Sequence, residues 1–394
     1  MSVLEQVWEH LDHFAQQNQE INGTFVAMLD APPTALEFLR MVHQGRPVLI
    51  KNAVKDWPAM QKWTNAYFRR VMGKETITVA CTPDGRADAV KVDDKTGKRY
   101  FCTPFERQMT FDAFLDILED SGTDPQSLVH YVSLQNGSMT SEFYSLMPDI
   151  VREVDWCSEA LGSSPDAVNF WFGDERSVTT MHKDPYENCY AVLRGQKTFV
   201  LIPPTEAMYL HEQAFPPATY EQDPVHNHTL RLKPLEDSEP VPWIELDPTN
   251  PDLSRFPQFS KAKPLTVTVQ QGDMLYLPAM WFHQVHQQGE DGVIAVNYWY
   301  DIDYQNPLYT TFPNTTSSDP RTKTATLTTV DGQDEYQDCL PCRLVGATAL
   351  TGLGAYAWLE ARKVRRLPGR TGTVAALGLT GAVAFGAGIY RLTM

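Results

Sequence analysis

A succession of short, apolar, β-rich segments between Val178 and His283 constrains the fold of this 394-residue chain more than any other feature. Glycine and proline interrupt the segments at short intervals, and valine, leucine, tyrosine and phenylalanine recur within them. Segments of this length and composition are typical of β-strands. Because such segments follow one another closely from 168 to 299, the sequence predicts an all-β core with helical additions.

His182 and Asp184 lie within this stretch and are separated by one residue. On an extended strand, side chains two residues apart point to the same face. His283, in a second β-like run, would add a third ligand from a neighbouring strand. Two imidazoles and one carboxylate form the facial triad of non-haem Fe(II) oxygenases. The H-x-D motif alone also fits a hydrogen-bonded core histidine, so its context has to support the metal site.

The context includes two apolar runs on either side of residues 194–196, which predict a β-hairpin. Lys197, Phe199 and Leu201 would share one face of the second run, so a single ammonium would lie on an apolar inner surface. A buried lysine is costly unless an anion pairs with it. A dicarboxylate would supply that anion. The alternative is a solvated lysine at the end of a strand.

Separated motifs in the right order resemble the jumonji-C family of 2-oxoglutarate oxygenases, in its small hydroxylase branch with cupin-8-like domains. The resemblance extends from near the N-terminus to about Tyr304. The motifs are Asp166-Ala-Val-Asn-Phe-Trp171, His182-Lys-Asp184-Pro-Tyr-Glu-Asn188, Gly272-Asp-Met-Leu-Tyr-Leu-Pro-Ala-Met-Trp281-Phe-His283 and Ala295-Val-Asn-Tyr-Trp299.

The resemblance implies a mainly β fold, the double-stranded β-helix or jelly-roll. It also implies that His182, Asp184 and His283 bind Fe(II), with 2-oxoglutarate and O2 as cosubstrates. Lys197 would bind the distal carboxylate of 2-oxoglutarate. The other implied cosubstrate residues are Tyr131, Thr179, Asn188, Asn297 and Trp299. Since Thr179 and His182 are an odd number of residues apart, a bulge between them is required if both face the site.

For the activity, the resemblance implies a protein hydroxylase, with C3 hydroxylation of lysine in developmentally regulated GTP-binding proteins as the expected reaction. A histone demethylase, a peptidase and a non-catalytic jumonji scaffold are the alternatives. The whole chain has a net charge of −16, whereas residues 339–394 carry +6, so the remainder carries −22. An acidic catalytic part suits a basic protein substrate, and solubility explains it equally well. We expect no direct nucleic-acid binding, and a homodimer is one option for the oligomeric state.

Four regions are expected along the chain. Residues 1–127 form an α/β lead-in, 128–312 the catalytic core, 313–338 a polar linker and 339–394 a two-helix membrane segment. In the lead-in, Thr34 and Glu37 predict a capping box at the start of a helix. Residues 147–161 are expected to form a helix over the side of the barrel. His226 and His228 are interpreted as surface histidines in a loop.

The C-terminal segment contains two charge-free apolar stretches, 344–359 and 371–390, which predict a transmembrane α-helical hairpin. A buried soluble helical hairpin is the alternative. The segment from Asp338 resembles the two-helix domain of the distal membrane-arm assembly component 1 family, which is associated with mitochondrial complex I. We therefore expect membrane anchoring, with a mitochondrial membrane as one address and the cytoplasm or nucleus as the alternative. Cys339 and Cys342 are interpreted as a structural or juxtamembrane feature of that family, with metal binding and a redox pair as the alternatives.

Overall fold

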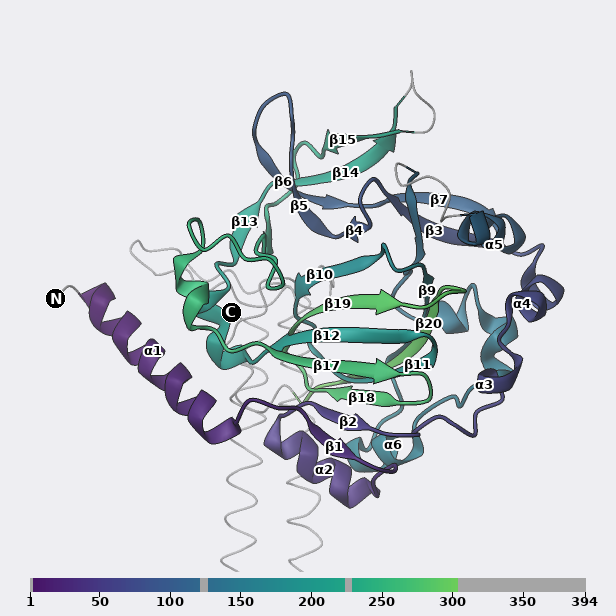
Figure 1. Cartoon of the computed structure of the whole chain (residues 1–394), viewed down its shortest axis with the longest axis horizontal. Coiled ribbons are helices and arrows are strands. Elements are labelled where there is room, and N and C mark those ends of the chain that lie inside the picture. Colours follow the sequence, from purple (N-terminus) through teal and green to yellow (C-terminus); the bar gives the residue numbers. More distant parts are fainter. Residues whose placement is uncertain (1–2, 121–126, 224–228, 304–394) are drawn as a thin grey trace, which may run out of the picture. The chain divides into compact units, whose positions relative to one another are not determined.

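Eight strands form the core of the protein in a computed structural model that describes residues 3–120, 127–223 and 229–303 (Figure 1). Consecutive core strands lie in different sheets, except for β12 and β17, which are neighbours in one sheet. The eight strands are β9 (Ala167–Gly173), β10 (Val178–His182), β11 (Tyr186–Arg194), β12 (Gln196–Ile202), β17 (Leu265–Gln270), β18 (Met274–Leu277), β19 (Phe282–Gln288) and β20 (Val293–Asp301). This is the jelly-roll arrangement that the sequence predicts.

The larger sheet has the order β1-β2-β18-β11-β20-β9-β8-β3-β7, and the smaller one has the order β17-β12-β19-β10-β4. Strands outside the core extend both sheets. These are β1 (Ala27–Leu29), β2 (Val48–Ile50), β3 (Thr76–Thr82), β4 (Arg86–Ala87), β7 (Phe105–Thr110) and β8 (Val129–Val132). Two further sheets, β15-β14-β6-β5 and β13-β16, consist of β5 (Ala89–Val92), β6 (Arg99–Thr103), β13 (Gln213–Phe215), β14 (Pro217–Gln222), β15 (Leu230–Pro234) and β16 (Val241–Trp243).

Helices precede the core or lie in its connections. The α-helices are α1 (Val3–Asn22), α2 (Ala35–Gln44), α3 (Ala59–Lys62), α4 (Asn65–Met72), α5 (Phe111–Asp120) and α6 (Asp155–Leu161). Short 3₁₀ helices are η1 (Ser138–Thr140), η2 (Tyr144–Asp149), η3 (Pro204–Tyr209) and η4 (Pro257–Lys261). No helix in the described ranges is long and apolar enough to cross a bilayer. The predicted linker, the predicted membrane hairpin, His226 and His228 lie outside those ranges.

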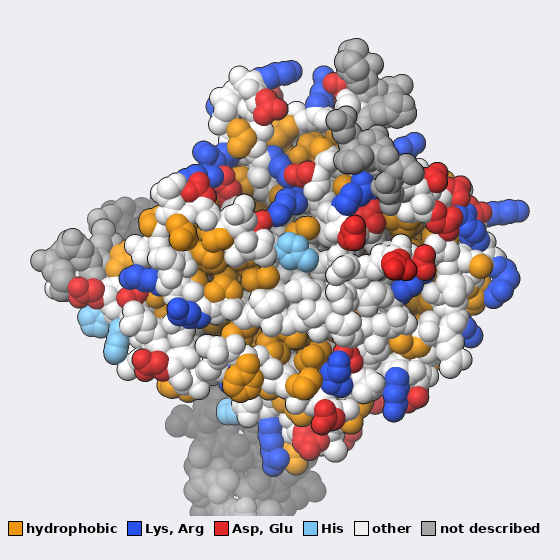
Figure 2. All heavy atoms as spheres, viewed as in Figure 1, with side chains coloured by type: hydrophobic (Ala, Val, Ile, Leu, Met, Phe, Trp, Pro, Cys, Tyr) orange, Lys and Arg blue, Asp and Glu red, His pale blue; other side chains and the backbone are white. Residues whose placement is uncertain are grey.

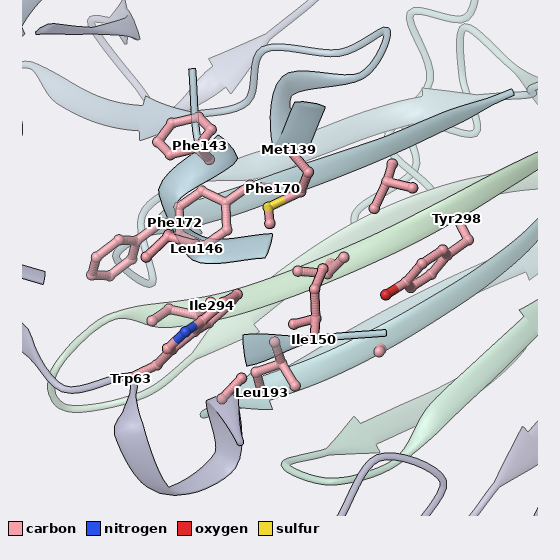
Figure 3. Packing of buried hydrophobic residues seen from close by; sticks show 14 of the residues in the cluster. Trp63, Met139, Phe143, Leu146, Ile150, Phe170, Phe172, Leu193, Ile294 and Tyr298 are labelled. Atoms are coloured by element: carbon pink, nitrogen blue, oxygen red, sulfur yellow. The ribbon is translucent and has the colours of Figure 1, made fainter. Parts of the chain in front are cut away.

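The two faces of the larger sheet contact different hydrophobic clusters. Its outer face packs against the helical additions through aromatic rings of β9 (Figure 3). Phe170 contacts Phe143 and Trp63, and Phe172 contacts Phe114 of α5. Its inner face meets the smaller sheet around Tyr190, and side chains of both sheets fill the barrel. The interior of the barrel is therefore a packed space in which each polar group needs a partner.

The outer face of the smaller sheet is apolar at one end, where Val200, Ile202 and Phe282 pack with residues of η3 and η4, and it is polar but largely uncharged elsewhere. Figure 2 views the molecule from this side. Most acidic and basic side chains in this view lie away from its centre. Strand β17 shows the alternation that produces this face. Its buried side chains are Leu265, Val267 and Val269, and its more exposed ones are Thr266, Thr268 and Gln270.

The predicted β-hairpin around residues 194–196 is wrong. Strand β11 pairs with β18 and β20 in the larger sheet, whereas β12 pairs with β17 and β19 in the smaller one. Gly195, with φ 72°, connects the two sheets instead of closing a hairpin. A glycine turn between apolar runs has the same sequence in both arrangements, and only the long-range pairing distinguishes them.

Local helix signals have mixed outcomes. The capping box at Thr34 and Glu37 is confirmed, since both of its reciprocal hydrogen bonds are present. The continuous helix expected over 147–161 is wrong, because η2 ends at Asp149 and α6 begins only at Asp155. The buried carboxylate of Asp149 accepts hydrogen bonds from Trp63 and Tyr67, and these tertiary contacts fix the chain at the interruption.

We expect Gly195→Ala to destabilise the protein more than Gly45→Ala. Both glycines have left-handed backbones, which cost a residue with a side chain about 1 to 2 kcal/mol. A Cβ at Gly45 would have no atom within 4 Å, whereas one at Gly195 would lie 2.8 Å from the Gln288 carbonyl oxygen. Urea unfolding of both variants measures the difference. Equal losses of stability would contradict a close contact at the connection between the sheets.

Candidate active site

Three side chains with metal-ligating atoms converge at one end of the barrel. His182 ends β10, Asp184 follows it, and His283 lies directly opposite His182 on the antiparallel strand β19. Their ligand atoms all lie within 4.8 Å of one another. One Asp184 oxygen, Oδ2, is 3.5 Å from the Nε2 atoms of both histidines. The predicted triad is therefore brought together by a single pair of strands.

Backbone carbonyls fix the orientation of both imidazoles. His182 Nδ1 lies 2.7 Å from the Thr180 carbonyl oxygen, and His283 Nδ1 lies 3.0 Å from that of Trp281. A proton on each Nδ1 makes these contacts hydrogen bonds and leaves the Nε2 lone pair free toward the centre of the triad. A hydrogen bond from the nitrogen that does not bind the metal is the usual way in which metal-bound histidines are oriented.

The electrostatics of the triad suit a bound cation. Burial and the neighbouring His182 lower the pKa of His283 to about 4, so its imidazole is neutral. Burial opposes ionisation of Asp184, but the two histidines outweigh it and lower the pKa of this carboxyl. Burial also opposes the charged form of His182, yet Asp184 raises its pKa. The charge that favours a proton here equally favours a metal ion.

A bulge separates Thr179 from His182, as the sequence requires. Thr179 pairs with Val285 and His182 with His283, so the register shifts by one residue between them. The Thr179 side chain reaches the hydroxyl of Tyr131, a hydrogen bond that lowers the pKa of Tyr131 against the stronger opposite effect of burial. The bulge therefore lets one strand contribute to both the triad and the interior of the barrel.

Lys197 lies inside the barrel, 1% exposed. Its Nζ donates to the Tyr131 hydroxyl at 3.0 Å and to Gln287 Oε1 at 2.6 Å. No carboxylate of the described residues forms an ion pair with it, and burial lowers its pKa to about 7. A buried amine with only neutral partners fits an anionic ligand, which would restore its charge.

Gln287 is a member of this site that the sequence reasoning missed. Its Nε2 donates to the Asp174 carbonyl oxygen at 2.6 Å, so its Oε1 is turned toward Lys197. A signal was available, because residues 283, 285 and 287 share one face of β19. Gly173 keeps the neighbouring space open, since a Cβ there would lie 2.5 Å from the Tyr131 ring.

The remaining predicted cosubstrate residues lie on β11 and β20. Asn297 accepts a hydrogen bond from Trp171 Nε1 at 2.7 Å and donates to Asn188 Oδ1 at 3.1 Å. Trp299 stacks on Tyr186, with ring centroids 4.8 Å apart. Its buried Nε1 has no hydrogen-bond partner among the described residues. An unsatisfied donor beside a row of amides is consistent with a ligand that supplies oxygen atoms.

A small pocket opens beside His182. It is lined by Met181, His182, Lys183, Glu212, Trp243 and Ile244. Trp243 stacks on the His182 imidazole, with ring centroids 6.1 Å apart and an angle of 7° between the planes. Asp88 also lies near His182, and burial raises its pKa to about 6 against the attraction of this histidine. Sequence reasoning missed Trp243 and Asp88, which come from segments outside the eight core strands.

The donor set fits Fe(II). Two imidazoles and one carboxylate on one side of a site leave positions for a chelating cosubstrate and for O2. Lys197 lies four residues along β12 from Leu201, which pairs with His283, so about 13 Å of strand separates it from the triad. The metal ligands and Lys197 therefore line the same barrel interior at separate positions along its strands.

Two separate parts of the chain match known protein families. A cupin-like domain matches residues 33–306, and a DMAC1/Dmo2-like domain matches residues 338–388. The human bifunctional peptidase and (3S)-lysyl hydroxylase JMJD7 is 44% identical over 77% of this chain and 93% of its own length. JmjC domain-containing protein E of Dictyostelium discoideum is 38% identical over 69% and 83%. Lysine-specific demethylase JMJ32 of Arabidopsis thaliana is 38% identical over 72% and 83%.

We expect His182→Ala to weaken Mn(II) binding by more than about 100-fold, because loss of a ligand exceeds the 10- to 100-fold effect of losing a residue that orients one. Electron paramagnetic resonance of free Mn(II) during titration of the full chain measures the affinity. His286→Ala is the matched control, since His286 is on the same strand as His283 but contacts Gln284 outside the triad. A similar loss in both variants would argue against this metal site.

Proposed function

Because the chain belongs to the cupin-like, jumonji-C family of Fe(II)- and 2-oxoglutarate-dependent oxygenases, we propose that it is a protein hydroxylase acting on lysine side chains. The observation that carries the proposal is the convergence of His182, Asp184 and His283 at one end of a barrel that also buries Lys197. The name of the human relative, a lysyl hydroxylase, supports lysine as the target. We further propose GTP-binding proteins as the substrate class, on the sequence resemblance alone.

In this proposal the residues of the chain have separate tasks. Fe(II), 2-oxoglutarate and O2 together supply the oxidising chemistry that converts a C–H bond to C–OH. His182, Asp184 and His283 would hold the metal in a fixed orientation. Lys197 would neutralise the distal carboxylate of 2-oxoglutarate, and the hydroxyls of Tyr131 and Thr179 would help to bind it.

The polar row on β11 and β20 has an orienting task. Trp171 holds Asn297, which in turn holds Asn188, so these amides are presented in one fixed arrangement. Tyr190 and Phe199 pack edge to face across the barrel with centroids 5.2 Å apart, and they exclude water from the lysine. Exclusion of water strengthens the attraction between Lys197 and a bound carboxylate.

Lysine demethylation is the second candidate, because a relative with similar identity is named a lysine-specific demethylase. The same triad serves both reactions, and they differ in whether the attacked carbon belongs to the lysine stem or to an N-methyl group. Membrane attachment through residues 339–394 and the address of the catalytic unit stay predictions from the sequence.

The test is to incubate the purified full chain with Fe(II), 2-oxoglutarate, O2 and lysine-containing peptides from GTP-binding proteins. We expect succinate formation together with a gain of one oxygen mass on lysine. His182→Ala should abolish both products. Loss of a methyl mass from methylated lysine peptides instead would favour the demethylase, and oxidation that persists in the His182→Ala protein would contradict the assignment.

Binding of 2-oxoglutarate should take up a proton above neutral pH. The free protein holds Lys197 with a pKa of about 7, below its ordinary value, so the amine is largely neutral at pH 8. A bound carboxylate favours the ammonium and raises this pKa. Affinity should therefore fall as pH rises through the free-state pKa. Calorimetry at pH 8 in buffers of different ionisation enthalpy measures the uptake, which we expect to approach one proton.

Lys197→Met is the matched variant for this measurement. It keeps a long unbranched side chain in the same space but cannot accept the proton. We expect it to weaken 2-oxoglutarate binding by about 10- to 100-fold, as for loss of a hydrogen bond to a charged group. Proton uptake should disappear with it. An unchanged uptake in this variant would place the titrating group elsewhere.

A further inference from the structure

Asp88 occupies a strained position between two short strands, β4 and β5. Its φ of 48° lies in the left-handed region, which few residues other than glycine adopt. The Thr180 hydroxyl donates to the Asp88 carbonyl oxygen at 2.7 Å and ties the residue to the strand that ends at His182. A strained residue held by the surrounding structure is a reason to look for a function.

The position of Asp88 is set by the pairing of β4 with β10. These strands run parallel, with Val178 opposite Arg86 and Thr179 opposite Ala87. Asp88 therefore comes level with Thr180, two residues before the metal ligand His182. Its carboxylate is near enough to interact electrostatically with that histidine.

An aromatic wall lies beside the same threonine. Trp243 Nε1 donates to the Thr180 hydroxyl at 3.3 Å, while its ring stacks on His182. Phe101 also packs against Trp243, with ring centroids 4.6 Å apart. Thr180 thus connects the backbone of Asp88 and the indole of Trp243 at the edge of the triad. Flat apolar rings next to a carboxylate suit an aliphatic chain that ends in a positive charge.

The carboxylate of Asp88 has no partner of its own within the described ranges of the chain. The nearby cations are engaged elsewhere, since Lys91 pairs with Asp84 at 2.5 Å and Arg86 pairs with Asp247 at 2.7 Å. No described side chain donates a hydrogen bond to it. A partly buried acid without a partner is costly unless a ligand supplies the cation.

We propose that Asp88 is the specificity residue that binds the ammonium group of the substrate side chain, with Trp243 and Phe101 holding its aliphatic stem. This inference rests on the proposed function for its catalytic consequence, because the substrate is then a lysine placed beside the metal. The binding preference itself is a property of the residues above. The expected ligand is a cationic side chain with an unbranched apolar stem.

The binding experiment uses the full chain loaded with Mn(II) and 2-oxoglutarate. The probes are Nα-acetyl-lysine N-methylamide and its norleucine analogue, which has an apolar side chain without the amine. Paramagnetic broadening of the probe protons by Mn(II) reports occupancy beside the metal. We expect the lysine probe to bind more tightly than the norleucine probe, and Asp88→Asn to weaken it by about 10- to 100-fold, as for a hydrogen bond to a charged group.

Two controls make the result specific. Asparagine tolerates a left-handed backbone, so Asp88→Asn should keep Mn(II) and 2-oxoglutarate binding, and its affinity for the norleucine probe should not change. Glu106→Gln removes a different negative charge, on exposed β7, that also interacts with Asp88. It should leave binding of the lysine probe close to that of the unaltered protein.

The inference fails if the unaltered protein does not prefer the lysine probe, if Asp88→Asn binds it equally well, or if Glu106→Gln costs as much. The proposed function fails separately. Asp88-dependent binding without any oxidation of lysine in the peptide assay would uphold the subsite and reject the hydroxylase. Lysine oxidation with an unchanged KM in Asp88→Asn would uphold the hydroxylase and reject this subsite, whereas a raised KM with little change in kcat supports both.

Discussion

The antiparallel pairing of β10 with β19 is the constraint on which the site depends. It sets His182 opposite His283, and the carbonyl contacts of both Nδ1 atoms turn the free Nε2 atoms toward Asp184. A shift by one residue would turn every side chain of a strand to the other face. The bulge before His182 uses that property locally, because it returns Thr179 to the interior while the histidine keeps its place. One metal ligand, His182, and one residue of the anion site, Thr179, therefore share strand β10.

The interior of the barrel departs from the usual rule that apolar side chains fill a core. Lys197, Gln287 and Asn297 are all buried there, and each has hydrogen-bond partners on neighbouring strands. Such a network is stable when its members are satisfied, and costly where one is not. Among the described residues, the hydrogen-bond partners of Lys197 are all neutral. Burial of this amine therefore lowers the stability of the free protein, and a bound dicarboxylate would offset that loss. Ligand affinity and protein stability are linked through this one side chain.

The parts that could be predicted from the sequence are those fixed by short-range spacing. The spacing of two residues between His182 and Asp184 predicts that they share a face. The capping box depends on the spacing of three residues between Thr34 and Glu37. The connection at Gly195 does not follow from local sequence, because the strands that pair with β11 and β12 lie far along the chain. Asp88 is tied to Thr180, 92 residues away, by a hydrogen bond to its backbone, and no local pattern signals that contact. Asn297 and Trp299 on β20 were predicted from the motifs of the resembled family, because residue spacing alone does not indicate them.

The two ends of the site are built from different parts of the chain, and this division bears on specificity. Core strands supply the triad and the lysine, and their side chains are fixed by packing on both sides. Asp88, Phe101 and Trp243 come from β-segments before β9 or between β12 and β17. Those segments reach the core through the pairing of β4 with β10 and through the shared hydroxyl of Thr180. Changes there can alter which side chain is held at the metal without disturbing the pairing of β10 with β19.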